Sequence, residues 1–375
     1  MRVVIARTMP EFSMDIYAHN LVSELRAVRP TWEIVDLAPR PVDRTSRSLW
    51  VRAEKAYERF WRFPQFVQRQ KADIFHIIDP AEAHIVYGLQ KQRKPTVVTC
   101  HDLINFSKNY NLQGSVQLPL VSRNLWLRAV RGMCYADHIC AVSAATAKDT
   151  TALLDIEPSR ITVTPNGVSP VFQPLASEQI ASIRQQYGLS PETFCLLNVG
   201  SNHPRKNILT VLKAVAILKQ KGMAVQFWKV GADFTDEQTA FIQAQNLAQL
   251  VKHIGKPDQT TLLQLYNAAD ILVAPSLAEG FGLTLLEAMA CGTPVITSNC
   301  SAMPEVAGEA GILIDPLNAE AIAQAVCQLH ANPDNYQGRS QKGIARAKLF
   351  NWRNTAEQVA ELYENVLSKR NLQLG

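Results

Sequence analysis

Two glycine-containing loops carry residue types that could bind a phosphorylated ligand. The first, Gly200–Asn207, directly follows the apolar segment Phe194–Val199 and contains the adjacent cations Arg205 and Lys206. Its glycine permits a sharp turn, and its proline preorders the start of the next helix. Unpaired amides, the positive end of a helix dipole and two cations together favour a diphosphate. For this loop taken alone, a solvated basic turn is the alternative.

The second loop places two carboxylates in the segment Glu279–Glu287, which reads EGFGLTLLE. Gly280 and Gly282 let bare backbone approach a ligand, and their amides continue into a helix N-terminus. Glu279 stands before that helix, whereas Glu287 lies about one turn inside it. We therefore predict that the two carboxylates contact different parts of one extended ligand. They do not suit glycoside hydrolysis, which needs facing carboxyls about 5–10 Å apart. An ordinary loop with a capping glutamate is the alternative.

Short apolar runs alternate with helical patterns along the whole chain, which is typical of β-α-β units with parallel sheets. The strands predicted in the first half are Val3–Ala6, Ile34–Leu37, Ile74–Ile78, Thr96–Cys100 and His138–Val142. Those predicted in the second half are Phe194–Val199, Val225–Val230, His253–Ile254, Ile271–Ala274, Val295–Thr297 and Ile312–Ile314. Because ligands of open parallel sheets lie beyond the carboxyl ends of the strands, the loops after these strands should carry the chemistry.

Helical spacing fills the intervals between the strands. The clearest predicted helices are Ile16–Arg26, Leu49–Gln70, Arg123–Met133, Ala144–Leu153, Leu209–Lys219, Thr260–Ala269, Leu283–Ala290, Ala319–Leu329 and Trp352–Leu367. A length of 375 residues suits two domains. A turn at Pro165–Gly167 and a proline-bearing hinge at Pro170–Ser177 mark the boundary. We therefore predict an α/β protein with two doubly wound, Rossmann-like domains, residues 1–172 and 173–352, facing across a cleft.

The segment Glu279–Val295 resembles the E-x7-E motif of the group 1 glycosyltransferases, glycosyltransferase family 4. Four further blocks are similar to the family's motifs and occur in the same order: Thr99–Leu103, Val142–Thr146, Pro165–Val168 and Asn198–Asn207. The resemblance runs from about Ile74 to Tyr363. It implies the GT-B architecture, with the donor nucleotide on the C-terminal domain and the acceptor on the N-terminal one. A final helix, about residues 353–375, would pack back on the N-terminal domain.

The resemblance also implies a retaining hexosyltransferase that uses a nucleotide-diphosphate sugar. Arg205 and Lys206 would hold the donor diphosphate, and Glu279 would bind hydroxyls of the transferred sugar. Glu287 would bind the ribose, and His101 would reach the reacting sugar from the N-terminal domain. The other implied donor-binding positions lie in the two loops and beside the base: Gly200, Asn207, Gly280, Phe281, Gly282, Leu283, Thr284, His253 and Pro257.

Two features of the sequence limit which roles can be transferred from the family to this chain. Family members commonly have a glycine pair in the first βα loop, but the matching segment here, Met9–Asp15, contains none, so this role is not transferred. The chain also has no Asp-x-Asp sequence, and we expect no metal or other cofactor because Arg205 and Lys206 can stabilise the departing phosphate. The remaining histidines with no motif around them are expected to be structural or to lie on the surface: His19, His76, His84 and His138.

Composition narrows the class of protein and its location. The chain contains no run of about 18 apolar residues, the length that crossing a bilayer requires. Its N-terminal segment is typical of a β-strand and not of a secretory signal. The seven cysteines lack CxxC spacing and lie mostly in apolar runs, which favours free thiols in a reducing cytoplasm. The net charge of +5 suits phosphorylated ligands or an anionic membrane surface. Nucleic-acid binding is disfavoured, because no motif for it accompanies the charge.

Residues 44–71 combine eight Lys or Arg residues with six aromatic residues. The aromatic residues at helical spacing are Trp50, Tyr57 and Trp61, and the cations between them are Arg52, Lys55, Arg59 and Arg62. Such a helix could lie peripherally on the cytoplasmic face of a membrane and present a lipid acceptor. The alternative is a surface helix whose aromatic stripe packs on the sheet while its cations face water, with Pro64 breaking the helical pattern.

Three functions remain open on the sequence alone. A glycosyltransferase acting on a hydroxyl acceptor, such as a lipid, a glycan or a lipid-linked glycan, is the leading hypothesis. A GT-B nucleotide-sugar epimerase or phosphorylase is less consistent with the E-x7-E block. A non-catalytic nucleotide-sugar binder is disfavoured, because a degenerate member should have lost some of four residues that are all intact here: His101, Arg205, Lys206 and Glu279. The sequence specifies neither the base, the sugar, the acceptor nor the oligomeric state.

Overall fold

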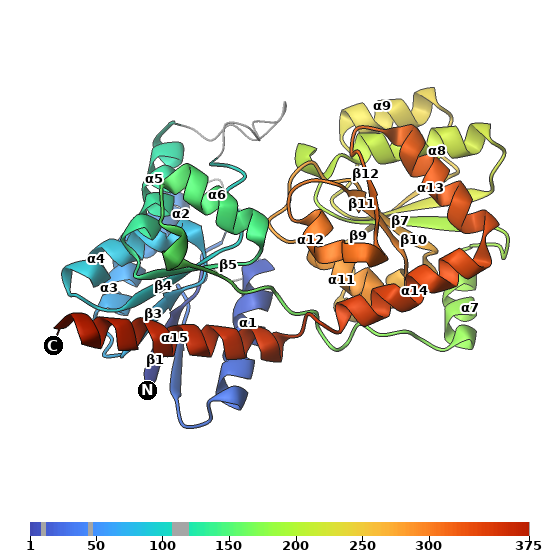
Figure 1. The fold of residues 1–375 in the computed structure, drawn as a ribbon. Helices are drawn as coiled ribbons and strands as arrows, with labels where there is room; N and C mark the ends of the chain where they lie inside the picture. The colour runs from blue at the N-terminus through green and yellow to red at the C-terminus, as the bar shows by residue number, and fades with distance from the viewer. Residues whose placement is uncertain (9–12, 44–47, 107–119, 375) are drawn as a thin grey trace. The chain divides into compact units, whose positions relative to one another are not determined.

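The computed structural model of the chain describes residues 1–8, 13–43, 48–106 and 120–374 (Figure 1). The described residues form two compact units. One comprises those up to Gly167 together with those from Trp352 onward, and the other comprises Val168–Asn351. Within the described ranges, no helix combines the length and the apolar composition that crossing a bilayer requires.

The described part of the first unit is built on a six-stranded parallel sheet with strand order β2-β1-β3-β4-β5-β6. The strands are β1 Arg2–Ala6, β2 Glu33–Leu37, β3 Ile74–Ile77, β4 Thr96–Cys100, β5 His138–Ala141 and β6 Ile161–Val163. Strands β3, β4 and β5 are buried at every position, because helices cover both faces of the sheet. Strand β6 was not among the predicted strands.

Two helical layers enclose this sheet. The α-helices of the first unit are α1 Ser13–Val28, α2 Leu49–Tyr57, α3 Phe63–Gln68, α4 Val86–Lys91, α5 Leu120–Arg131, α6 Ala144–Leu154 and α15 Trp352–Leu374. On one face, α1 and α15 bury a shared cluster that includes Tyr17, Leu21 and Tyr363 (Figure 1). On the other face, α3, α4 and neighbouring short turns bury a second cluster around Phe63, Phe75 and Leu89.

The predicted helix Leu49–Gln70 is present as α2 and α3 joined by a π-helical turn, Glu58–Arg62. The expectation that Pro64 breaks this pattern was wrong. Pro64 occupies the first turn of α3, where a proline is tolerated because no intrahelical N–H bond is required. The wider π turn lies directly before this proline and joins the two helices without a break.

The second unit has a six-stranded parallel sheet with strand order β12-β11-β10-β7-β8-β9. The strands are β7 Phe194–Gly200, β8 Val225–Gly231, β9 Val251–Gly255, β10 Ile271–Ala274, β11 Val295–Ser298 and β12 Ile312–Ile314. The α-helices are α7 Ser177–Gln186, α8 Ile208–Gln220, α9 Asp236–Ala244, α10 Gln259–Ala268, α11 Leu283–Ala290, α12 Met303–Ala307, α13 Ala319–Ala331 and α14 Pro333–Ala347. The predicted fold class, two doubly wound parallel α/β sheets, is confirmed.

The strand order defines where a ligand should bind in the second unit. The chain runs from β7 outward through β8 to β9, and it then returns to the other side of β7 as β10. The loops after β7 and β10 therefore diverge from adjacent strands at a topological switch point, which is where open α/β sheets bind ligands. These two loops contain Arg205, Lys206 and Glu279.

Candidate active site

The loop after β7 begins at Gly200 and ends in a short 3-10 turn, Pro204–Lys206, before α8. Asn207 adopts left-handed backbone geometry between the turn and the helix. Its side-chain amide donates to the carbonyl oxygens of Pro275 (3.1 Å) and Pro316 (2.6 Å). The side chain of Asn207 thus ties the β7 loop to the β10 loop.

Glu279 lies where the two cations meet. Its carboxylate is 2.5 Å from Nη1 of Arg205 and 2.5 Å from Nζ of Lys206, and only 9% of its side chain is exposed. Ser276 Oγ donates to Glu279 Oε1 (2.9 Å). Ser301 Oγ accepts from the Glu279 amide (3.0 Å) and donates to its carbonyl oxygen (2.7 Å). Both the backbone and the carboxylate of Glu279 are therefore held in place.

The electrostatics of Glu279 follow from these contacts. Burial opposes its ionisation, but the charges and hydrogen bonds of Lys206 and Arg205 outweigh burial and hold the pKa of Glu279 below its ordinary value. Arg205 also donates to the carbonyl oxygen of Ala278 (3.1 Å), and its own carbonyl oxygen accepts from the Leu277 amide (2.7 Å). The loop containing Arg205 and the loop containing Glu279 thus form one rigid, charged unit.

Glu287 has a different environment from Glu279. It lies in α11, and Tyr266 Oη donates to its Oε2 (2.7 Å). Burial raises the pKa of Glu287 to about 7, although the bond from Tyr266 works in the opposite direction. One carboxylate thus pairs with two cations and the other with a neutral phenol. The prediction that the two carboxylates contact different parts of a ligand stays a prediction.

The backbone between the two carboxylates forms the start of α11. Gly282 has φ +105°, a backbone angle that residues with a side chain rarely adopt. It caps α11, whose first residues are Leu283 and Thr284. Phe281 is buried and makes an edge-to-face contact with Phe350, with 5.9 Å between ring centroids. Phe281 therefore anchors the loop, while the first amides of the helix supply the positive end of its dipole.

The residues predicted beside the base lie at the edge strand of the second sheet. His253 is in β9, where its Nε2 is 3.0 Å from the carbonyl oxygen of Gly231 and its Nδ1 is 3.2 Å from Asp233. Pro257 follows β9 and is half-buried. Both belong to the same carboxyl edge of the sheet as the two loops, because all strands of the sheet run parallel.

Lys229 is a charged residue of this region that the sequence interpretation missed. It is fully buried in β8, and its Nζ donates to the carbonyl oxygens of Gly200 (2.7 Å) and Val230 (3.0 Å). Burial, together with the nearby charge of Lys206, lowers the pKa of Lys229 to about 8. Lys229 could have been recognised from the sequence, because a lysine within the apolar run Val225–Val230 is unusual. Tyr266 and Ser301, which position the two glutamates, carried no comparable signal.

His101 belongs to the first unit and lies just after β4. Its Nε2 is 2.9 Å from the carbonyl oxygen of Ile78, which can only accept, so Nε2 carries the proton and Nδ1 remains an acceptor. Burial lowers the pKa of His101, and the charge of Asp79 opposes this effect. Its ring meets Tyr17 edge-on, with 4.7 Å between centroids. His101 is thus held as an oriented imidazole at the carboxyl edge of the first sheet.

Two of the histidines predicted to be structural or on the surface are held by protein partners. His76 is fully buried between Tyr363 Oη (2.6 Å from Nδ1) and Thr99 Oγ1 (2.7 Å from Nε2), and burial lowers its pKa to about 3. His138 Nε2 is 2.9 Å from Thr162 Oγ1. Most of the glycine-free segment Met9–Asp15, residues 9–12, lies outside the described residues.

The aromatic stripe of the predicted basic helix does not pack on the sheet. Trp50 is 86% exposed, Tyr57 57% and Trp61 59%. The expectation that all the cations face water was also wrong, because Arg59 pairs with Glu82 (2.9 Å) and Arg62 pairs with Glu58. Both glutamates are almost fully buried. A buried carboxylate requires a cationic partner, so the two arginines point inward and pair with the glutamates, whereas the aromatic side chains stay exposed to solvent.

Comparison with solved structures identifies the fold. A sucrose-phosphate synthase from Thermosynechococcus elongatus aligns over 98% of this chain and 100% of its own, with a TM-score of 0.78 and 22% identity. An Anabaena protein, HepE, solved in complex with UDP-glucose, aligns over 97% of this chain and 100% of its own, with a TM-score of 0.73 and 18% identity. At these identities the likeness shows the fold alone, which is GT-B.

Sequence comparison then places the chain in a family. The family described as Glycosyl transferases group 1 matches residues 193–332, and the one described as Glycosyltransferase Family 4 matches residues 14–172. The chain therefore belongs to the group 1 glycosyltransferases. A relative named O-antigen chain mannosyltransferase B, from Escherichia coli, is 30% identical over 234 residues. That match covers 61% of this chain and 61% of the relative, so the chain spans less than two thirds of the relative's length.

Proposed function

We propose that the chain is a retaining glycosyltransferase that moves a hexose from a nucleotide-diphosphate sugar to a hydroxyl group of a glycan or a lipid-linked glycan. The observation that carries this proposal is the convergence of Arg205 and Lys206 on Glu279 at the switch point of the second sheet. Membership of the group 1 glycosyltransferases and the relative named as an O-antigen mannosyltransferase support the reaction class and the acceptor class.

The pairing of both cations with Glu279 leaves them able to bind a diphosphate. A guanidinium has five N–H donors and an ammonium has three, so each cation retains donors when one oxygen of Glu279 is bound. Their shared carboxylate holds both cations beside each other. In the proposed complex, Glu279 also accepts hydrogen bonds from sugar hydroxyls, Glu287 binds the ribose hydroxyls, and the base lies against His253–Pro257.

The proposed catalysis is electrostatic. Breaking the bond between the anomeric carbon and the diphosphate places negative charge on the leaving phosphate, which Arg205, Lys206 and the first amides of α11 stabilise. The acceptor hydroxyl attacks from the same face that the phosphate leaves, which retains the anomeric configuration. Lys229 adds a fixed positive charge beneath the Gly200 turn. No step of this scheme requires a metal. The role of His101 at the reacting sugar stays a prediction from the family resemblance.

The donor and the stereochemistry can be tested together. Thermal-shift screening against UDP-, GDP- and ADP-sugars should reveal one donor that raises the melting temperature, because a ligand that binds only the folded state stabilises it. With that donor and an oligosaccharide acceptor, proton NMR should show a product with the anomeric configuration of the donor, and EDTA should leave the rate unchanged. An inverted product would refute retention, and EDTA-sensitive turnover would refute metal independence.

We also propose that the protein binds peripherally to an anionic membrane at the cytoplasmic face. The exposed side chains of Leu49, Trp50 and Tyr57 on α2 support this, together with the exposed Arg52. The double variant Trp50→Ser/Arg52→Glu should reduce flotation with phosphatidylglycerol vesicles, whereas Leu317→Ser, which removes an exposed leucine from the second unit, should not. Equal flotation of all three proteins would refute membrane binding.

A further inference from the structure

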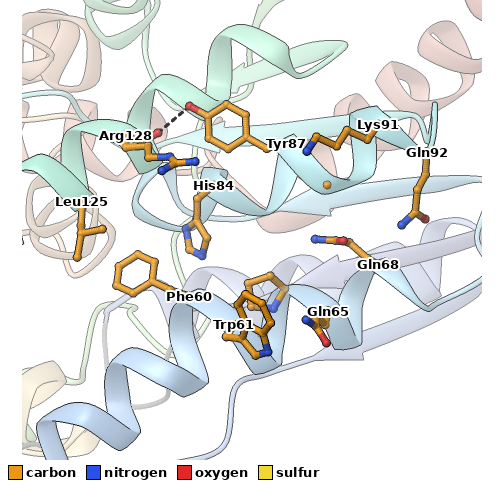
Figure 2. A pocket seen from close by; sticks show the side chains of 12 residues that line it. Phe60, Trp61, Gln65, Gln68, His84, Tyr87, Lys91, Gln92, Leu125 and Arg128 are labelled. Atoms are coloured by element: carbon orange, nitrogen blue, oxygen red, sulfur yellow. Dashed lines mark hydrogen bonds between the residues drawn. The ribbon is translucent and has the colours of Figure 1, made fainter.

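A pocket of about 530 Å³ opens in the helical layer of the first unit (Figure 2). The π turn and α3 form one wall, α4 forms the floor, and α5 closes the opposite side. Its volume lies within the roughly 300–1,000 Å³ of small-molecule sites. The lining residues Gln68 and Gln92 lie shortly before β3 and β4 begin, so the pocket extends toward the amino edge of this sheet. It is therefore distinct from the carboxyl edge, where His101 lies.

Aromatic side chains supply the apolar part of the pocket. Phe60 and Trp61 come from the π turn, and Tyr87 comes from α4 (Figure 2). Trp61 is 59% exposed, so more than half of its surface is accessible to a ligand. Flat aromatic surfaces of this kind pack against the C–H faces of sugar rings while the sugar hydroxyls reach neighbouring polar groups.

Amide side chains supply hydrogen-bonding capacity that the protein does not use. The side chains of Gln65, Gln68 and Gln92 line the pocket and make no hydrogen bond among the residues that the structure describes. Each amide offers a carbonyl acceptor and two N–H donors, which suits adjacent hydroxyl groups. Gly88 makes room for one of them, because a Cβ there would lie 2.1 Å from Gln68 Nε2.

The charge of the pocket is positive. Lys91 and Arg128 are exposed lining residues, and no aspartate or glutamate is among the residues that line the pocket. The nearby Glu82 is 1% exposed and pairs with Arg59, so its charge does not face the ligand space. Tyr87 Oη donates to the carbonyl oxygen of Arg128 (2.9 Å) and fixes the backbone below this guanidinium. Neither cation forms an ion pair with the part of the chain that the structure describes, and two such cations favour an anionic ligand over a neutral one.

We propose that this pocket is a second carbohydrate site, which binds a phosphorylated saccharide. The aromatic surface packs on the sugar ring, the glutamine amides bind its hydroxyls, and Lys91 and Arg128 bind the phosphate. The further statement that this saccharide is part of the acceptor rests on the proposed function; binding itself does not. The phosphate could come from a lipid-linked sugar diphosphate or from a phosphorylated glycan, since both present the same chemistry to the pocket.

Titration of the full chain with mannose 6-phosphate tests the site, because mannose is the sugar named for the relative. The indole N–H signal of Trp61, assigned with Trp61→Phe, should shift on titration, and unphosphorylated mannose should bind more weakly. Lys91→Glu/Arg128→Glu should weaken binding about tenfold or more, since two charge-assisted contacts are lost. All these side chains are exposed, so the variants should fold.

Matched variants separate this site from the donor site. Arg123→Glu, an exposed cation of α5 outside the pocket, and Lys206→Ala should both leave the affinity for mannose 6-phosphate unchanged. A short alkyl diphosphate-linked mannose that binds more tightly would identify a lipid-linked source, and one that binds no more tightly would identify a phosphorylated glycan. The proposal is overturned if neither ligand binds, or if binding survives Lys91→Glu/Arg128→Glu but is lost in Lys206→Ala. A protein that binds at the pocket but turns over no donor would refute only the proposed function.

Discussion

At the scale of single residues, the two glutamates of the E-x7-E segment differ in what their neighbours do to their charge. Glu279 is kept ionised by Lys206 and Arg205, whereas burial beside Tyr266 raises the pKa of Glu287 to about 7. The sequence was enough to select these residues as candidate ligand-binding residues, because both loops contain glycines and charged residues directly after a predicted strand. The direct pairing of Arg205 and Lys206 with Glu279 could not, because it depends on two strands that are distant in sequence becoming neighbours.

The raised pKa of Glu287 predicts a pH-dependent stability. An unfolded glutamate ionises near 4.5 and the folded one near 7, so the unfolded state loses its proton first and folded stability falls between these values. Glu287→Gln removes this penalty. Urea unfolding should show the variant to be ~1–2 kcal/mol more stable than the wild type at pH 8, with a much smaller difference at pH 5. Donor affinity at pH 8 should fall, because the amide loses the charge that the ribose hydroxyls bind.

The exposed Glu192 supplies the control for this experiment. Glu192→Gln should change neither the pH dependence of stability nor donor binding. A Glu287→Gln protein with the same stability difference at pH 5 and pH 8 would contradict the raised pKa.

At the scale of elements, the ends of β7 and β8 are packed so closely that the site depends on a glycine outside both loops. Gly231 has φ +105°, and a Cβ there would lie 2.2 Å from the carbonyl oxygen of Gly200. This carbonyl oxygen also accepts from Lys229 Nζ. The turn that begins the β7 loop therefore rests directly on the end of β8.

Gly231→Ala should displace Gly200 and weaken both folding and donor binding. Gly188→Ala is a matched control, because Gly188 also has positive φ (+77°) but has open space where the Cβ would go. Chemical denaturation should show Gly231→Ala to be about 1–3 kcal/mol less stable than Gly188→Ala, the difference being the steric clash. Only Gly231→Ala should lower donor affinity. Equal stability and equal donor binding of the two variants would contradict the close packing.

The helices illustrate where sequence patterns succeed and where they fail. The span of the basic aromatic helix was predicted from its periodicity, and its start at Leu49 agrees with the structure. The exposure of its aromatic residues was not predictable, because periodicity indicates that one face is apolar but not whether the protein covers it. Burial of Glu58 and Glu82 turned Arg59 and Arg62 inward. Strand β6 was missed because a threonine interrupts its short apolar run, whereas the equally short β12, Ile312–Ile314, is apolar throughout and was predicted.

At the scale of the whole chain, the C-terminal helix returns to complete the first unit. Tyr363 of α15 is fully buried, and its Oη lies 2.6 Å from Nδ1 of His76 in β3. Trp352 and Tyr17 meet in the same cluster, with 5.6 Å between ring centroids. The core on this face of the first sheet therefore includes residues from both the first strands and α15.

Tyr363→Ala should destabilise the protein by roughly 3–5 kcal/mol, because it leaves a cavity and removes a partner of buried His76. Leu372→Ala on the same helix removes an 81% exposed side chain and should be close to neutral. Differential scanning calorimetry of the two variants measures this difference. Similar transitions for both variants would show that α15 contributes little to the first core.

The central claim is that Arg205, Lys206 and Glu279 form the site of sugar transfer, and donor turnover tests it most directly. Release of nucleoside diphosphate from the donor found by thermal shift should be measured for the wild type, Lys206→Ala, Glu279→Ala and the surface control Lys213→Ala. We expect turnover by the wild type and Lys213→Ala, and a loss of at least about 100-fold in the other two variants, the cost of losing one preorganised charge contact. Unchanged turnover in Lys206→Ala and Glu279→Ala, or a wild type that binds donors without releasing product, would contradict it.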